Sequence, residues 1–562
     1  MLRHLAIASS LANLLYLPVW GQLLPGAPLH YFMQEPPPRG ALFTAIAEVA
    51  VLTLIFWGGA VVARRSRSPW VKTAASFLFV TAVLAAANGF RRQMPQLNLR
   101  SVMMLTGRPA FLVLAALLGL GAIFVALRWW PRVVRATAVV MLIFFPFVPF
   151  TLVRASWAMV NYGESYADFA DGPYAPKQPA SATAPKPVVM IIFDELDYHI
   201  AFENRPPGLE LPELDRLAAQ SVRTTQAYPP AGETLLSIPA LVTGRRISAA
   251  QAIGPRQLQT TLADSKQIEM LNGAPTMFSA WRAAGGNAVA VGFLHPYCRV
   301  FNESLVDCAW VADYAGQSRE HVPGLTMAET ATIQAAQVLD AFPLVGRLGV
   351  RRMLVDRTKA ARRGRQGRGV KRFEYLLGES KRILEQRAGD LTYLHLPVPH
   401  WPFFFDRAQG TYVSQGQRTY LDNLALMDRT LGELRQIMER SGAWDASTVL
   451  ITADHWFRFN MWKPWKSRGE SAALGRDTDF RVPLLVKFPG QTSAQVYEKP
   501  LNTVLIPDLV AAIGAGRATE VNAAAWLDER GSYAPPICGR NSACGAQRPP
   551  KAAPAGGAQK PS

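Results

Sequence analysis

The sequence predicts an α/β domain, built on a mostly parallel sheet flanked by helices, preceded by an α-helical membrane domain of about five spans. Five apolar runs fill the first 155 residues, strand-like runs alternate with helix-like segments after residue 187, and polar side chains follow several of those strands. A chain of 562 residues is also too long for one compact domain.

The apolar runs occupy residues 5–24, 41–63, 73–90, 109–127 and 136–153. Each is close to the length of about 17–25 residues that a helix needs to cross a bilayer. The first run is not a cleavable signal peptide, because no small-residue cleavage site follows it. We therefore expect residues 1–154 to form a multi-pass membrane domain.

Basic residues between the runs indicate its orientation. With the N-terminus in the cytosol, eight Lys and Arg residues fall on the cytosolic side and five on the other side, as the positive-inside rule favours. An odd number of spans then places everything after Arg154 across the membrane.

The four cysteines all follow the membrane part and form two close pairs without the CxxC spacing of metal sites. Two local disulfides in an oxidising periplasm are the simpler interpretation. The expected pairs are Cys298–Cys308 and Cys538–Cys544.

Composition divides the rest of the chain. Residues 155–186 are rich in Pro, Ala, Ser and Gly and predict a linker, residues 546–562 predict a disordered tail, and residues 187–545 remain for the main domain. Of the net charge of +18, the run 347–372 supplies +10. This run fits a solvated loop or an anionic lipid contact; no nucleic-acid motif accompanies it, so we expect no nucleic-acid partner.

The main domain begins with VVMIIF at residues 188–193, a continuous apolar run typical of a strand buried on both faces. Further strand-like runs lie at 287–293, 391–396, 447–452 and 482–488, with helix-like segments between them. This alternation predicts a mostly parallel sheet, whose ligand site lies at the carboxyl ends of the strands.

Candidate metal ligands follow three of these strands. Asp194 and Glu195 follow the first strand, His400 follows 391–396, and Asp454 and His455 follow 447–452. Oxygen and imidazole ligands predict one divalent ion, with Zn²⁺ preferred over Mn²⁺ or Ca²⁺. The alternative is that each residue is an ordinary helix cap or loop polar group.

The stretch AGETLLSIPALVTGRR at residues 231–246 carries Thr234, Ser237 and Thr243 in an apolar setting. This pattern predicts either a buried helix with scattered hydroxyls or a helix that begins with a hydroxyl nucleophile. Thr234 follows the helix-breaking AYPPAGE, so it would stand at a helix N-terminus, which favours an anionic phosphate. The alternative is an ordinary N-cap threonine.

Five segments in this order resemble the sulfatase branch of the alkaline phosphatase superfamily: FDELD, TLLSIPALVTGR, TYLDNLALMDRTLGEL with STVLITADH, DFRVPLLVKFPG and LNTVLIPDLVAAIG. They cover about residues 187–514. The resemblance implies an alkaline-phosphatase-like fold, with Asp194 and Glu195 as the paired acidic ligands. Counting back from the TGR at 243–245 places Thr234 at the nucleophile position.

The chain also departs from sulfatases. Formylglycine is made from Cys or Ser, so Thr234 cannot form it, and Ser237 lies in Ser-x-Pro with Leu241 where that motif needs Arg. A threonine nucleophile behind a membrane anchor resembles phosphoethanolamine transferases and lipoteichoic acid synthases, although the Gly-Glu-Thr-Ser form of the metal strand is missing. These enzymes move a phospho-headgroup from a phospholipid to an envelope glycan or lipid. The resemblance implies the bacterial inner membrane, with the catalytic domain in the periplasm.

We expect a monomer in which a metal activates Thr234 and a phospho-threonine intermediate forms. The expected metal ligands are Asp194 and/or Glu195, Thr234, Asp454 and His455. The expected substrate-binding residues are His400, His295, Lys463 and Lys466. His400 is also the candidate for proton transfer, whereas His395 is expected to be structural. A hydrolase of the same fold and a non-catalytic envelope protein remain alternatives.

Overall fold

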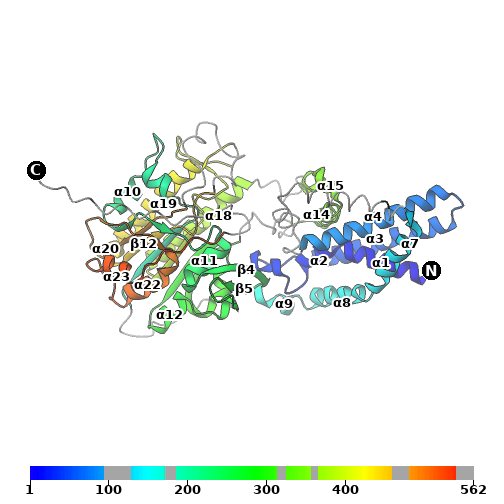
Figure 1. Ribbon diagram of the computed structural model, residues 1–562, viewed down its shortest axis with the longest axis horizontal. Coiled ribbons are helices and arrows are strands. Elements are labelled where there is room, and N and C mark those ends of the chain that lie inside the picture. Colours follow the sequence, from blue (N-terminus) through cyan, green and yellow to red (C-terminus); the bar gives the residue numbers. More distant parts are fainter. Residues whose placement is uncertain are drawn as a thin grey trace, which may run out of the picture. The chain divides into compact units, whose positions relative to one another are not determined.

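A computed structural model describes residues 1–93, 124, 128–169, 171, 185–312, 325–355, 365–414, 416–458 and 480–538. The chain divides into two compact units (Figure 1). The first contains Met1–Phe169 and Tyr314–Arg363, and the second contains Ala170–Asp313 and Gly364–Ser562.

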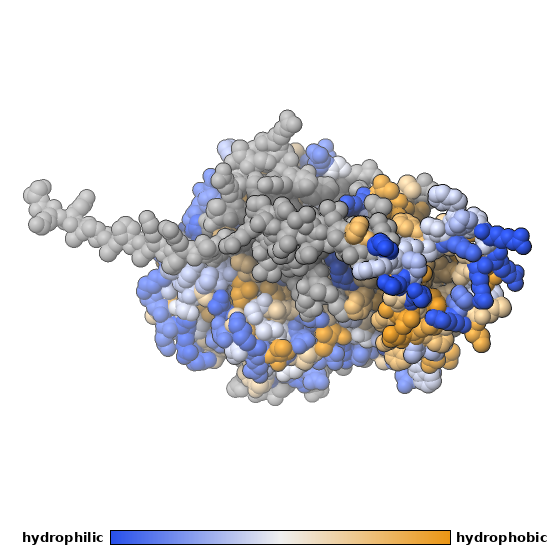
Figure 2. Space-filling view, turned by 45° about the vertical axis from the view of Figure 1, so that its right-hand side comes forward, coloured by the Kyte–Doolittle hydropathy of each residue, from blue (hydrophilic) through white to orange (hydrophobic). Residues whose placement is uncertain are grey.

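The first unit is helical. Its N-terminal helices are α1 (Leu2–Leu15), α2 (Leu17–Leu23), α3 (Arg39–Arg65), α4 (Pro69–Gln93), α7 (Trp130–Ile143), α8 (Phe147–Val160) and α9 (Tyr162–Ser165). Large hydrophobic side chains are exposed along α3, α4, α7 and α8, and Figure 2 shows this hydrophobic surface at its right. Such a surface suits a membrane anchor.

The expectation of five spans is corrected. Among the described residues, α3 and α4 are long and apolar enough to cross a membrane, and α7 with α8, bent by 40°, adds at most a third span. The expected span at 5–24 is divided at Tyr16, because Pro18 has no N–H to continue the helix. The expected span at 136–153 is divided at Pro146 for the same reason. The expected span at 109–127 lies outside the described residues, apart from Phe124.

Three helices from the middle of the chain belong to the first unit: α14 (Met327–Asp340), α15 (Pro343–Arg347) and α16 (Val350–Val355). Gln334 of α14 donates a hydrogen bond to the carbonyl of Ala41 at 3.0 Å, and Asn88 donates to the carbonyl of Ala341 at 2.8 Å. The basic run at 347–372 thus begins in the helical unit.

The second unit is built on an eight-stranded sheet with the order β14-β2-β13-β12-β1-β9-β7-β8. Its strands are β1 (Val188–Phe193), β2 (Val222–Thr224), β7 (Ala288–Phe293), β8 (Leu305–Val311), β9 (Leu391–Leu396), β12 (Thr448–Thr452), β13 (Leu484–Lys487) and β14 (Gln495–Tyr497). Neighbouring strands are parallel except where β13 pairs with β12 and β2. The sheet is therefore mostly parallel, as predicted, and it is mixed because β13 runs antiparallel to both of its neighbours.

Helices cover both sides of this sheet, as predicted. Figure 1 shows α18 (Arg365–Gln386) and α19 (Tyr420–Arg440) on one side, and α12 (Met277–Ala283) and α22 (Ile506–Gly514) on the other. The remaining longer elements are α10 (Pro212–Ala218), α11 (Thr234–Thr243), α23 (Ala523–Arg530) and the antiparallel strands β4 (Ile247–Gly254), β5 (Gln257–Leu262) and β6 (Ile268–Met270).

The strand β1 is central, and all six of its residues are buried. Its register pairs Ile192 with Thr452 of β12 and Phe193 with Leu396 of β9. The carboxyl ends of three adjacent parallel strands therefore meet at one edge of the sheet. This register brings together the polar residues that follow each strand.

A disulfide joins Cys298, in the short helix α13 (Tyr297–Val300), to Cys308 in β8, with the Cα atoms 5.6 Å apart. Cys538 is also disulfide-bonded. Its expected partner, Cys544, lies outside the described residues. Disulfides fit an oxidising compartment.

Replacing Cys298 and Cys308 together by serine is expected to lower the stability of the second unit. The bond closes a loop of 10 residues, so its loss should cost about 2–3 kcal/mol through loop entropy in the unfolded chain. Thermal unfolding of the variant and the wild type would measure this difference. An equal melting temperature for both proteins, or two alkylated thiols at these positions in the untreated wild type, would contradict it.

Candidate active site

The two neighbouring acidic residues after β1 differ in backbone conformation and in the partners of their side chains. Asp194 continues the strand, and its N–H donates to the carbonyl of Leu396 at 3.1 Å. Glu195 has a φ of +66°, a left-handed conformation that is uncommon outside glycine. Because the backbone turns here, the side chains of Asp194 and Glu195 reach different partners.

Asp194, Asp454 and His455 form one buried cluster, in which one potential ligand atom from each residue lies within 4.8 Å of the others. His455 Nε2 is 3.4 Å from Asp194 Oδ1 and 3.5 Å from Asp454 Oδ2. All three side chains are almost fully buried. The pairing of β1 with β12 brings these ligands together.

The His455 tautomer suits a metal ligand. Its Nδ1 lies 3.0 Å from the carbonyl oxygen of Trp456, and since a carbonyl can only accept, Nδ1 carries the proton. Burial, together with Arg458, lowers the pKa of His455 well below its usual range. The Nε2 lone pair therefore faces the two carboxylates, which is the arrangement that a bound cation requires.

The carboxylates have few partners. Both oxygens of Asp194 and Oδ2 of Asp454 are buried without a hydrogen-bond partner among the described residues. Burial and the nearby Asp454 raise the pKa of Asp194 well above its usual range. Because unpaired buried charges are unfavourable, two carboxylates and an imidazole fit a divalent cation, and the imidazole favours Zn²⁺ or Mn²⁺ over Ca²⁺.

Thr234 lies beside this cluster. It is the first residue of α11 and is 7% exposed, and its Oγ1 is 3.3 Å from His455 Nε2. The N-cap residue is Glu233, so Thr234 is not an ordinary N-cap threonine. Its hydroxyl faces the cluster at the N-terminus of a ten-residue helix, where an anion is stabilised.

The other two hydroxyls of this stretch have local roles. Ser237 donates to the carbonyl of Ala231 at 2.8 Å and accepts from the N–H of Ala231 at 3.1 Å. Thr243 donates to the carbonyl of Pro239 at 2.7 Å. Both hydroxyls therefore hold the backbone, and only Thr234 presents its hydroxyl to the cluster.

His295 contacts Thr234 through the backbone. Its Nε2 lies 3.2 Å from the carbonyl oxygen of Thr234, to which it donates. Burial lowers the pKa of His295 to about 4, so the ring is neutral near pH 7. This geometry indicates that His295 positions Thr234, whereas we expected it to bind substrate.

His400 lies in the loop after β9. Its N–H donates to the carbonyl of Asp194 at 3.1 Å, and its ring centre is 6.5 Å from that of His455. Its Nδ1 contacts the Trp401 carbonyl, and its Nε2 is 3.4 Å from an Arg458 nitrogen that can only donate. The His400 ring thus lies near the cluster, with Nε2 as an acceptor that Arg458 contacts.

Sequence reasoning missed Arg458. Its Nε donates to Glu195 Oε1 at 3.0 Å, and this ion pair is almost fully buried. The only signal in the sequence was a cation four positions after Asp454. The lysines to which we assigned substrate binding, Lys463 and Lys466, lie outside the described residues.

The local charges fit a divalent ion. Among the described residues, three buried carboxylates, from Asp194, Glu195 and Asp454, lie near the guanidinium of Arg458. In their ionised forms these four groups carry a net charge of −2, which one divalent cation would neutralise. Glu195 therefore supports Arg458, and the structure gives Glu195 no place among the three clustered ligands.

Replacing Arg458 by methionine is expected to destabilise the protein, because it leaves Glu195 buried without its cation. Breaking one partner of a buried ion pair costs about 3–5 kcal/mol. The double variant Glu195→Gln/Arg458→Met should recover most of that loss. Guanidinium unfolding would measure all three proteins, and a double variant no more stable than Arg458→Met would refute the pairing.

Several residues of the sulfatase-like segment TYLDNLALMDRTLGEL have structural roles. Tyr420 donates to the carbonyl of Glu195 at 2.8 Å and accepts from the N–H of Asp197 at 3.1 Å. Asp428 accepts from the N–H of Leu214 at 2.8 Å. A side chain at Gly432 would lie 2.9 Å from Glu213 Cγ. They fix the loop after β1 and pack α10 against α19.

His395 is buried within β9, and its Nδ1 is 2.8 Å from the hydroxyl of Tyr297. It lies beside the aromatic ring of Phe293, with 4.4 Å between the ring centres. These contacts fit the structural role expected for it.

Comparison with known proteins supports the resemblance. The Sulfatase family model matches residues 376–515, about a quarter of the chain, including Asp454 and His455. No curated protein matches. Residues 376–515 are thus sulfatase-like, as the sequence motifs predicted.

Several solved structures are distantly similar. Lipoteichoic acid synthase LtaP from Listeria monocytogenes has 14% identity, covering 61% of this chain and 74% of its own, with a TM-score of 0.35. PsFucS1 sulfatase from Pseudoalteromonas sp. has 14% identity, 59% and 68% coverage and a TM-score of 0.39. The phosphonate monoester hydrolase of Agrobacterium radiobacter has 15% identity, 58% and 73% coverage and a TM-score of 0.36.

Proposed function

We propose that this protein is a membrane-anchored, metal-dependent phosphotransferase. It moves a phosphoethanolamine- or phosphoglycerol-type headgroup from a phospholipid to an envelope glycan or lipid through phospho-Thr234. The observation that carries this proposal is the Thr234 hydroxyl, 3.3 Å from His455 in the buried Asp194, Asp454 and His455 cluster. The sulfatase-like segment supports ester cleavage as the class of reaction.

The nucleophile favours phosphate over sulfate chemistry. Thr234 cannot become formylglycine, and the nearby Ser237 is held by both backbone groups of Ala231. A hydroxyl at a helix N-terminus suits attack on a phosphodiester, because the helix dipole stabilises the phosphate charge. A retained set of buried ligands also argues against a degraded, non-catalytic site.

In this proposal Asp194, Asp454, His455 and Thr234 would hold a divalent ion, which when bound lowers the pKa of a coordinated hydroxyl and neutralises phosphate charge. Thr234 Oγ1 attacks phosphorus, the new Oγ1–P bond forms, and the bond to the diacylglycerol oxygen breaks. The proton of Thr234 ends on that oxygen. His400, whose ring centre is 6.5 Å from that of His455, is the group proposed to carry it.

The second half-reaction reverses these roles. An acceptor hydroxyl attacks the phosphorus of phospho-Thr234, the Oγ1–P bond breaks, and the acceptor proton returns to Thr234. In the tautomer that its contacts indicate, His400 Nε2 is an acceptor, and in this proposal it takes the proton in place of its contact with Arg458. Arg458, held by Glu195, keeps the His400 ring in place through its 3.4 Å contact.

The proposed location is the bacterial inner membrane, with α3 and α4 among the anchoring helices and the second unit in the periplasm. The Cys298–Cys308 disulfide supports an oxidising compartment. The proposed protein is a monomer that meets its phospholipid donor in the membrane.

The experiment supplies purified full-length protein with phosphatidylethanolamine or phosphatidylglycerol vesicles and no acceptor. The expected products are diacylglycerol and a peptide whose mass is increased by a phosphate-linked headgroup at Thr234. Steady release of free headgroup would instead identify a hydrolase with water as acceptor. Neither diacylglycerol nor an adduct in metal-loaded protein would refute the proposal, and mass spectrometry of envelope glycans and lipids with and without the protein would identify the acceptor.

A further inference from the structure

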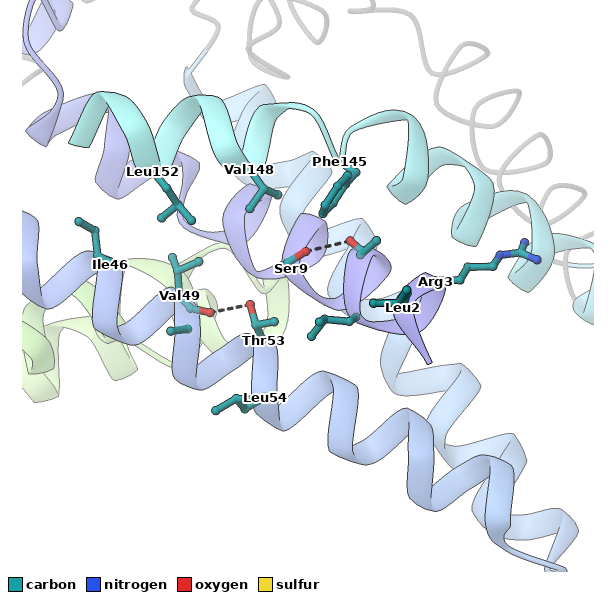
Figure 3. A pocket seen from close by; sticks show the side chains of 13 residues that line it. Leu2, Arg3, Ser9, Ile46, Val49, Thr53, Leu54, Phe145, Val148 and Leu152 are labelled. Carbon is teal, nitrogen blue, oxygen red and sulfur yellow. Dashed lines mark hydrogen bonds between the residues drawn. The ribbon is translucent and has the colours of Figure 1, made fainter. Parts of the chain in front are cut away.

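The helical unit contains an apolar cavity of about 750 Å³ between α1, α3 and α8 (Figure 3). Its lining residues come from three stretches of the sequence, at 2–9, 46–54 and 145–152. Leucine, isoleucine, valine, alanine and phenylalanine side chains form almost all of its wall. The hollow is open at the surface of the bundle, since Leu2 and Leu54 in its wall are 83% and 59% exposed.

The hydroxyls that line the cavity are already satisfied. Thr53 donates to the carbonyl of Val49 at 2.7 Å, and Ser9 donates to the carbonyl of Ala6 at 3.1 Å, as the dashed lines in Figure 3 show. An ordered water needs two to four polar partners. The wall therefore suits neither ordered water nor a polar ligand, and a long apolar group is the matching occupant.

Of the described residues that line the cavity, Arg3 is the one that is charged. It lies in the first turn of α1 and is exposed. Figure 3 shows its guanidinium at one end of the site, pointing away from the apolar side chains. An apolar hollow with a cation at its end matches an amphiphile that has an anionic head and hydrocarbon tails.

Volume distinguishes the possible occupants. A helix of 18 residues, about 27 Å long and 10 Å wide, fills about 2,000 Å³, more than the cavity holds. An acyl chain that crosses one leaflet of about 15 Å fills on the order of 400 Å³. The two chains of one diacyl lipid thus match the 750 Å³ of the cavity.

We infer that this cavity holds the acyl chains of a resident phospholipid whose phosphate lies beside Arg3. The inference rests on the insertion of α3 in a membrane, and it is independent of the proposed transfer reaction. A resident lipid fills the space between α1, α3 and α8 and is not consumed.

The test is native mass spectrometry of the full-length protein, released from detergent micelles, with identification of the retained lipid. Ala50→Trp introduces a bulky ring at the cavity, whereas Ala47→Trp places the same ring on an exposed part of α3 that does not line it. We expect one intact phospholipid per wild-type chain and at least a tenfold smaller lipid-bound fraction in Ala50→Trp only. Arg3→Gln should weaken retention several-fold, and Arg64→Gln, an exposed change at the end of α3, should not.

A second measurement on the wild type does not depend on a folded variant. A photoactivatable acyl chain on phosphatidylglycerol should label peptides covering 2–9, 46–54 and 145–152 in preference to the exposed surface of α4. Uniform labelling, or equal lipid retention by Ala50→Trp and Ala47→Trp, would overturn the inference.

Other occupants give different results. A dimer that Ala50→Trp alone dissociates would place a second copy in the cavity, and a cross-link from Leu54→Cys to residues 109–127 would place the protein's own chain there. Lipid retention that differs between the wild type and Thr234→Ala would mark the bound lipid as a substrate. Each of these outcomes overturns the inference of a resident lipid, and only the last bears on the proposed function.

Discussion

Replacing Thr234 by alanine is expected to abolish headgroup transfer without unfolding the protein. The variant loses the only hydroxyl of the 231–246 stretch that faces the buried cluster. Removal of a nucleophile that carries a covalent intermediate lowers the rate by a factor on the order of 10⁴ or more. Thr234 does not cap its helix, so the stability cost should be small, about 1 kcal/mol or less. Diacylglycerol release from phospholipid vesicles measures the activity.

Two control variants separate chemistry from packing. Thr234→Ser keeps the hydroxyl and should retain measurable activity. Ser237→Ala should lower stability, because the backbone groups of Ala231 lose their partner, yet it should still form the adduct. Fragmentation of the peptide that contains both residues would locate the headgroup. An active Thr234→Ala protein, or a headgroup on Ser237, would show that Thr234 is not the nucleophile.

The position of the site could be predicted from the sequence because parallel strands are strongly patterned. VVMIIF is a continuous apolar run, LTYLHL and STVLIT are strand-like runs, and in the structure the three segments contain the adjacent strands β1, β9 and β12. The polar residues that directly follow these strands must then meet at one edge of the sheet. Hence the grouping of Asp194, Asp454 and His455 could be predicted from the sequence.

The roles of individual side chains could not be predicted in the same way. Asp194 and Glu195 look equivalent in the sequence, and only the left-handed backbone at Glu195 separates them. The role of Arg458 could not be predicted for a related reason, since it depends on an ion pair with Glu195, which is 263 residues away. Such pairings arise from tertiary structure and leave no local pattern.

The membrane part shows a different limit. Hydropathy measures how apolar a run is, but Pro18 and Pro146 interrupt two of the runs by removing backbone donors. The packing of α14 among the first helices joins segments about 290 residues apart. Neither hydropathy nor local propensity carries information on a contact of that range.

Asp194→Asn is expected to remove the bound metal, whereas the neighbouring change Glu195→Gln should leave it in place. Asp194 offers the cluster two buried oxygens that have no hydrogen-bond partner in the described part of the chain, while Glu195 is engaged by Arg458. Losing a directly coordinating carboxylate should weaken metal binding more than the roughly 10–100-fold typical of outer partners. Elemental analysis of purified full-length protein would compare the wild type and both variants, with Asp454→Ala as a further variant that should lose the metal.

Stability gives an independent measure of the same site. Chelation should lower the melting temperature of the wild type, because it leaves Asp194 and Asp454 buried side by side without a cation. Asn at position 194 relieves that repulsion, so the melting temperature of Asp194→Asn should no longer respond to chelator. Glu195→Gln should melt lower overall because Arg458 loses its partner, yet it should still respond to chelator as the wild type does. Full metal content in Asp194→Asn, or loss of metal in Glu195→Gln alone, would contradict the assignment of Asp194 as a metal ligand and Glu195 as the partner of Arg458.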